Sequence, residues 1–169
     1  RGLGDVYKRQ IENRAFAGAR YMTSARIPQS VHSMGESVFS GCRSLERMDI
    51  PGSIKTVPAD TLFACAALKE LSIGSGIQTI GRRAFGGCTA LESVRIPDGV
   101  TELDAMAFMG DGELVSAFIP ESVKIIGAEA FARCGKLREI SLPGGIEDIG
   151  AAAFSSCAAL AEKDGFVMI

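Results

Sequence analysis

Apolar residues recur along this chain with a period of about 23 residues. The clearest marker is phenylalanine, which returns at intervals of 23, 24, 22, 23, 23 and 23 residues, at Phe16, Phe39, Phe63, Phe85, Phe108, Phe131 and Phe154. A leucine follows five or six residues after all but the first, at Leu45, Leu68, Leu91, Leu114, Leu137 and Leu160. A fixed period of this length is typical of a solenoid, in which one structural unit repeats along the chain.

Each unit contains two short segments that predict strands. In the first, apolar and polar residues alternate up to a proline, as in residues 91–97 and 137–143, which indicates a strand that ends where the chain turns a corner. A second apolar segment follows, as in residues 123–127, and ends on a recurring corner glycine such as Gly81 or Gly127. The small residues around each phenylalanine predict a short helix or 3₁₀ turn on the far side of the coil.

These units predict an α/β solenoid of about seven coils, each of 22–24 residues. A unit this small cannot bury its own apolar stripe, so the coils must stack, and the repeating phenylalanines form an interior ladder. Repeat three departs from the pattern, because Gly74 stands where proline is expected and Pro58 where the corner glycine is expected. Its phenylalanine spacing also slips by one residue in each direction, so we expect a local distortion there.

The periodicity also sets the domain limits. It places the solenoid at residues 11–160. Residues 1–10 do not fit the repeat and are interpreted as a non-native or disordered lead. Residues 161–169 lose the period and are interpreted as the start of a truncated following segment. We see no capping unit at either end and therefore interpret the chain as a fragment of a longer protein.

Composition and charge exclude several classes of partner. The chain is 47% hydrophobic and 22% charged, which suits one substantial core. Its 18 Lys and Arg against 20 Asp and Glu give a net charge of −2, so no basic field attracts nucleic acid. No apolar run approaches the roughly 20 residues that cross a bilayer, so direct membrane insertion is not expected.

The repeat resembles the BspA-like class of leucine-rich repeat. The resemblance is carried by residues 96–100, 126–134 and 137–143 and extends over about residues 11–160. It implies a right-handed curved solenoid in a cell-surface or secreted protein of a host-associated bacterium or a parasitic protist. The function it implies is adhesion, with a host extracellular-matrix or cell-surface protein as partner.

The five cysteines are interpreted as reduced structural residues. Cys42, Cys65, Cys88, Cys134 and Cys157 share one repeat position, which Ala19 and Asp111 fill in the other coils. A metal site would need paired short spacings or histidine partners, and neither is present. Neighbouring cysteines of the stack could come within disulfide reach, but the odd count and the replacement by alanine argue against a disulfide framework.

No residue set predicts an enzyme, a cofactor or a metal. The single histidine, His32, occupies a repeat position that Lys55, Gln78 and other polar residues fill elsewhere, so it is expected to be solvated and without a catalytic partner. Gly74, Gly76 and Gly81 have the wrong spacing for a phosphate-binding loop. The carboxylates Glu147 and Asp148 are interpreted as outward repeat positions.

The outward positions of the first strand segment form the candidate partner-binding surface. Side chains between two buried strand positions point away from the core and are free to vary. The candidate residues on this face are Arg26, Asp49, Ser72, Arg95, Val115, Phe118 and Ser141. Phe118, with Val115 beside it, breaks the polar pattern and is a candidate binding anchor. The alternative is that Phe118 packs on side chains of the neighbouring strands.

Three functions remain open at this stage. The resemblance favours an extracellular adhesion or ligand-binding module. The five unpaired cysteines favour an intracellular protein-interaction scaffold, because secreted proteins more often avoid free thiols. The third is a repeat region attached to an enzyme domain outside this fragment.

Overall fold

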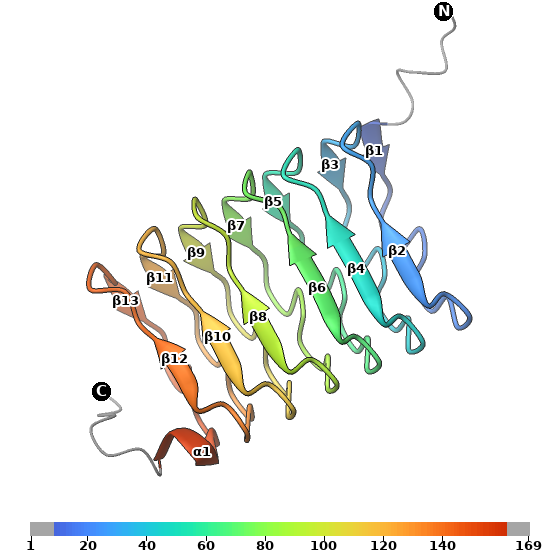
Figure 1. The fold of residues 1–169 in the computed structure, drawn as a ribbon. Helices are drawn as coiled ribbons and strands as arrows, with labels where there is room; N and C mark the ends of the chain where they lie inside the picture. The colour runs from blue at the N-terminus through green and yellow to red at the C-terminus, as the bar shows by residue number, and fades with distance from the viewer. Residues whose placement is uncertain (1–8, 162–169) are drawn as a thin grey trace, which may run out of the picture.

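The computed structural model describes residues 9–161, which form a parallel β-solenoid of about six turns (Figure 1). Each turn contributes a longer strand to one face and a two-residue strand to the other. The expected seven coils are therefore not confirmed. Residues 1–8 of the lead expected at residues 1–10, and residues 162–169 of the segment expected at residues 161–169, lie outside the described residues. Gln10 is the first residue of a strand.

The strands alternate between the two faces in chain order. The longer strands are β2 (Ser24–Arg26), β4 (Arg47–Ile50), β6 (Glu70–Ile73), β8 (Ser93–Arg95), β10 (Ser116–Phe118) and β12 (Glu139–Ser141). The two-residue strands are β1 (Gln10–Ile11), β3 (Ser33–Met34), β5 (Thr56–Val57), β7 (Thr79–Ile80), β9 (Glu102–Leu103), β11 (Ile125–Ile126) and β13 (Asp148–Ile149).

Neighbouring strands pair in parallel and keep a register of 23 residues, so that Arg47 lies opposite both Ser24 and Glu70. The short strands form one five-stranded sheet, β5–β7–β9–β11–β13, and the pair β1–β3. The longer strands form two separate sheets, β2–β4–β6 and β8–β10–β12. The ladder of longer strands is thus interrupted between β6 and β8, and repeat three lies on one side of the interruption.

The far side of each coil consists of turns, and α1 (Ala158–Ala161) is the one helix among residues 9–161. Backbone N–H groups on this side bond to the next coil, as Phe39 does to the Thr61 carbonyl at 2.9 Å. Arg83 and Gly87 there have φ angles of 51° and 75°, which an α-helix does not contain. The expected α/β class is therefore not confirmed, and the described residues form a β-solenoid. About every second amide on this side bonds to the next coil, and the others close short turns within their own coil, as Ser40 does with the Ser37 carbonyl at 3.1 Å.

The core is one continuous stack of apolar side chains. Phe85, Phe108 and Phe131 are fully buried, and the centroids of successive rings lie 5.2 Å apart. Phe154 continues the stack at 5.5 Å from Phe131. Phe16, the first marker of the period, is 43% exposed and stacks on Phe39 at 5.3 Å. The expected interior ladder is therefore present, with its first ring open to solvent.

Coil three, which contains Phe63, has a leucine at the position of the interior ladder. Leu62 is fully buried, and its N–H donates to the carbonyl of Ala84, the residue before Phe85. In the next coil the N–H of Phe85 donates in the same way to the carbonyl of Ala107, the residue before Phe108. Phe63 lies outside the core, partly buried, with the guanidinium carbon of Arg83 4.9 Å from the ring centroid. The expectation that Phe63 belongs to the interior ladder was wrong, because the 23-residue register is unbroken in coil three.

Candidate functional site

The candidate residues lie on the outward face of the longer strands, which we call the broad face. Residues of neighbouring strands stand directly opposite one another, so the face consists of two rows. The first row is Ser24, Arg47, Glu70, Ser93, Ser116 and Glu139. The second row is Arg26, Asp49, Ser72, Arg95, Phe118 and Ser141. The residues between them, such as Met48 and Val94, point inward and are buried.

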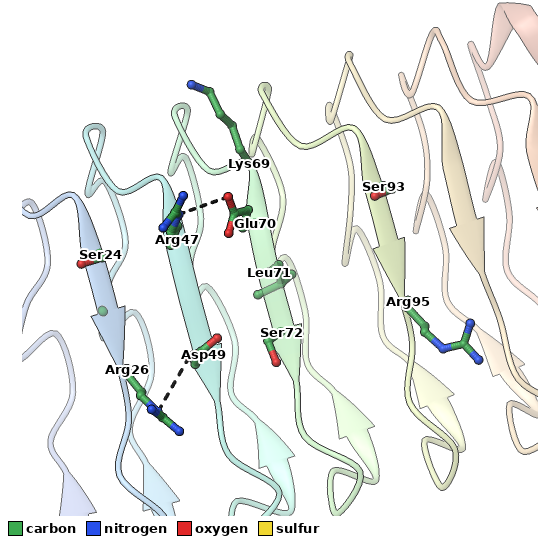
Figure 2. Close-up of a pocket in the computed structure, with 11 residues that line it drawn as sticks. Ser24, Arg26, Arg47, Asp49, Lys69, Glu70, Leu71, Ser72, Ser93 and Arg95 are labelled. Carbon is green, nitrogen blue, oxygen red and sulfur yellow. Dashed lines mark ion pairs between the residues drawn. The ribbon is translucent and has the colours of Figure 1, made fainter.

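Opposite charges pair across β2, β4 and β6. Arg26 Nε lies 3.8 Å from Asp49 Oδ2, and Arg47 Nε lies 3.1 Å from Glu70 Oε1 (Figure 2). These residues line a depression of about 730 Å³ that extends to Arg95 on β8. Because all four side chains are well exposed, the ion pairs contribute little to folding stability. Their effect is to compensate the charges of Arg26 and Arg47 on this half of the broad face.

Arg95 and Phe118 form the other half of the site. They are directly opposite in the β8–β10 ladder, and the guanidinium carbon of Arg95 lies 4.1 Å from the centroid of the Phe118 ring. This is a cation–π contact. Phe118 therefore does pack on a neighbouring strand, as the alternative expected, yet 45% of the residue stays exposed. Its role as an anchor remains a prediction.

Val115 does not belong to this cluster. It precedes β10, is partly buried, and uses its carbonyl to accept the N–H groups of Arg138 and Glu139. The recess around Phe118 is lined by residues of β8, β10 and β12, including Arg95 and Ser141, and Val115 is not among them. The structure thus brings Arg95, Phe118 and Ser141 together and places Val115 apart.

Sequence reasoning overlooked two residues at the interruption of the ladder. Leu71 and Ile73 on β6 occupy the inward positions of the repeat. Both are only partly buried, and Leu71 lines the depression beside Arg95. The available signal was Gly74, which replaces the proline of the other repeats directly after β6.

The interior column of cysteines is free and buried. Each Sγ donates to a carbonyl on the far side of the preceding coil, as Cys65 does to Phe39 at 3.2 Å and Cys134 does to Phe108 at 3.2 Å. Burial raises the pKa of Cys65 to about 12. Such thiols stay protonated near neutral pH and are poor nucleophiles, so the column supports a structural role.

Asp111 takes the cysteine position in its coil and is fully buried. Its Oδ1 accepts the backbone N–H of Cys88 at 2.8 Å, whereas Oδ2 has no hydrogen-bond partner within the described part of the chain. Burial raises the pKa of this carboxyl well above its ordinary value, and the Cys88 N–H opposes that shift in part. The site therefore favours the protonated, neutral carboxyl.

The described residues offer neither a metal centre nor a membrane span. Between residues 9 and 161, no group of three or more His, Cys, Asp and Glu side chains is arranged to hold a metal ion. No helix in the same range is long and apolar enough to cross a bilayer.

A stack of parallel coils with buried leucine and phenylalanine ladders and a variable outer strand face defines a leucine-rich-repeat scaffold, a class that generally binds proteins. The sequence pattern of the BspA type leucine rich repeat region matches residues 7–115 and 57–164, with six copies. The chain belongs to this family.

Solved structures of other leucine-rich repeat proteins are similar to this chain. A protein from Bacteroides ovatus is 34% identical with a TM-score of 0.84, over 89% of this chain and 39% of that one. One from T. pallidum is 28% identical with a TM-score of 0.86, over 90% of this chain and 72% of that one. A leucine rich cell surface protein of Faecalibacterium prausnitzii shares the fold at 23% identity and a TM-score of 0.52, over 83% of this chain and 54% of that one. A comparison with curated proteins finds no match.

Proposed function

We propose that this solenoid is the protein-binding module of a cell-surface or secreted protein and that its broad face contacts the partner in adhesion or ligand binding. The single observation that carries the proposal is the pairing of Arg95 with an exposed aromatic ring on a face of parallel strands. Aromatic residues and arginine are the side chains that most often dominate the energy of protein interfaces.

The strands make the broad face suitable for this role. Phe118 and Arg95 are held by the β8–β10 ladder, so little conformational entropy would be lost when a partner binds them. Their contact with each other also orients the guanidinium before the partner arrives. No described residue supplies a catalytic set around them, so binding is the activity that this arrangement supports.

The proposed location rests on family resemblance and on a related fold. The F. prausnitzii protein that shares the fold is described as a cell surface protein. The second candidate, an intracellular interaction scaffold, is favoured by the five free cysteines. However, all five are buried, and burial raises the pKa of each of these thiols. They are therefore poorly accessible to oxidants, which weakens the argument against a secreted protein.

The test compares capture of purified extracellular-matrix proteins and of host-cell lysate proteins by immobilised wild type and by the double variant Arg95→Glu/Phe118→Ser. We expect the variant to bind a matrix protein at least about tenfold more weakly, because both the cation and the ring are lost. Arg20→Glu/Tyr21→Ser is the matched control, since it makes the same kinds of change at exposed residues outside the broad face.

Melting curves of all three proteins establish that the fold is retained. Equal capture by wild type and by the broad-face variant would contradict the assignment of this face. Capture from the lysate without capture of any matrix protein would favour the intracellular scaffold.

A further inference from the structure

The interruption between β6 and β8 exposes part of the core in the middle of the solenoid. These strands lie side by side in Figure 1 but belong to different ladders. At the inward positions of β4, Met48 and Ile50 are 1% and 2% exposed, whereas their counterparts on β6, Leu71 and Ile73, are only partly buried. Partial burial of inward residues recurs in the terminal strands, at Ala25 of β2 and Ile140 of β12. β6 therefore has the exposure of an end strand, and we call the space beside it, between β6 and β8, the seam.

The seam follows from the departure of repeat three from the repeat pattern. Gly74 donates its N–H to the Ile50 carbonyl at 2.9 Å, a bond that the proline of the other repeats cannot make. Accordingly β4 and β6 have four residues each, while the other longer strands have three. A Cβ on Gly74 or Gly76 would overlap the backbone of Gly52, so the corner of coil three lies directly against coil two.

The corner of coil four lies further from coil three. A Cβ on Gly99 of coil four would have the carbonyl oxygens of Ser75 and Ile77 of coil three as its nearest contacts, at 3.6 and 3.8 Å. These are ordinary van der Waals distances. At this corner, coil three therefore lies closer to the coil before it than to the coil after it, on the same side of the solenoid as the interruption between β6 and β8, whereas on the other sheet β7 still pairs with β9.

The seam contains a recess with an apolar floor that is bordered by Arg95, whose guanidinium is directed towards Phe118 on β10, and by Asp98. The recess has a volume of about 420 Å³ and is lined by Leu71, Ser72, Ile73, Ser75, Arg95, Pro97 and Asp98. It shares Leu71, Ser72 and Arg95 with the larger depression of the broad face. Figure 2 shows Leu71 and Ser72 on one side of the seam and Arg95 on the other. The exposed carboxylate of Asp98 lies among the corner residues that follow β8.

Arg95 differs from the other arginines of the broad-face rows. Arg26 and Arg47 are each paired with a carboxylate. Arg95 makes no ion pair with any residue between 9 and 161, and its guanidinium instead rests on the Phe118 ring. An exposed guanidinium held in place without a counter-charge is a site for an external carboxylate, which it can bind through two parallel hydrogen bonds.

We infer that the seam binds an extended segment of a partner protein that carries an acidic residue within two positions of an aliphatic or aromatic residue. The apolar side chain rests on Leu71 and Ile73, and the carboxylate extends over β8 to the Arg95 guanidinium beside the Phe118 ring. This inference rests on the proposed function, because it specifies where on the broad face a partner is bound and by what chemistry.

The test uses the whole chain and two arrays of synthetic octapeptides. One array places Asp or Glu one or two residues from Leu, Ile or Phe, and the other carries Asn or Gln in place of each acidic residue. We expect wild type to retain a subset of acidic peptides and to bind their amide counterparts about tenfold more weakly. Ser72→Trp fills the recess from an exposed position and should lower the retained binding at least about tenfold.

Ser33→Trp is the matched control, because it makes the same change at an exposed position of β3, on the other sheet of the solenoid and away from the recess. It should leave peptide binding unchanged. Equal binding of acidic and amide peptides, no binding of any peptide up to about 1 mM, or full binding by Ser72→Trp would overturn the inference. A matrix partner lost by Arg95→Glu/Phe118→Ser but retained by Ser72→Trp would reject the seam and leave the proposed function standing.

Discussion

At the scale of single residues, the buried rings carry the largest expected effects on stability. Phe131 is fully buried between Phe108 and Phe154. Phe131→Ala should lower the free energy of unfolding by about 3–5 kcal/mol, because it removes a buried ring and leaves a cavity. Phe63→Ala is the matched control from coil three, where the ring lies outside the core, and should cost about 1 kcal/mol or less. Urea denaturation of both variants measures the difference, and equal losses would be incompatible with Leu62 as the interior residue.

Asp111 predicts a pH dependence of stability. Its folded-state pKa is raised well above the ordinary value of 3.8, so the folded chain holds a proton that the unfolded chain has released. Its contribution is complete below about pH 4 and is lost as the pH rises towards the folded-state pKa. Asp111→Cys, which restores the residue of the neighbouring coils, should be increasingly more stable than wild type over this range, by about 1.4 kcal/mol per pH unit at most. Melting curves at several pH values test this, and a constant difference would show that Asp111 is ionised in the fold.

At the scale of the elements, the contact between the corners of coils two and three predicts a contrast between glycines. Gly76→Ala places a methyl group on the backbone of Gly52 and should destabilise the fold by about 1–3 kcal/mol. Gly112→Ala meets no atom within 4 Å and should change stability by about 0.5 kcal/mol or less. Both are measured by denaturant unfolding. If the two variants were equally stable, coil three would not be packed against coil two as the structure shows.

The elements also show where local pattern was sufficient and where it was not. The alternating segments that end at a proline form the longer strands, because side chains that point alternately to the core and to solvent are typical of a strand. The small residues around each phenylalanine predicted a short helix or 3₁₀ turn. Some of their amides do bond within the turn, as Ser40 does with Ser37, but others bond to the next coil, as at Phe39 and Thr61, and a pattern within one coil cannot reveal a partner in another.

At the scale of the whole molecule, each coil contacts its neighbours in sequence, so the core extends as a row of similar layers. The parallel register sets side chains that are 23 residues apart directly opposite each other, such as Arg95 and Phe118. The broad face is therefore a surface assembled from one or two residues per coil. A partner that spans several coils is expected to contact side chains from all of them and not those of any single repeat.

The sequence by itself determined the period, the stacking of coils, the identity of most interior residues and the rows of the broad face. These depend on contacts that recur identically in each coil, so a repeated pattern is enough to reveal them. Tertiary structure decided that Leu62 and not Phe63 enters the core, that Val115 lies apart from Phe118, and that a seam opens after β6. The seam depends on how coil three packs on coil two, through the Gly74 amide and the glycine contacts of coil three. The position of Leu62 depends on the bond of its amide to the next coil. Such differences between coils arise only when the coils are stacked on one another.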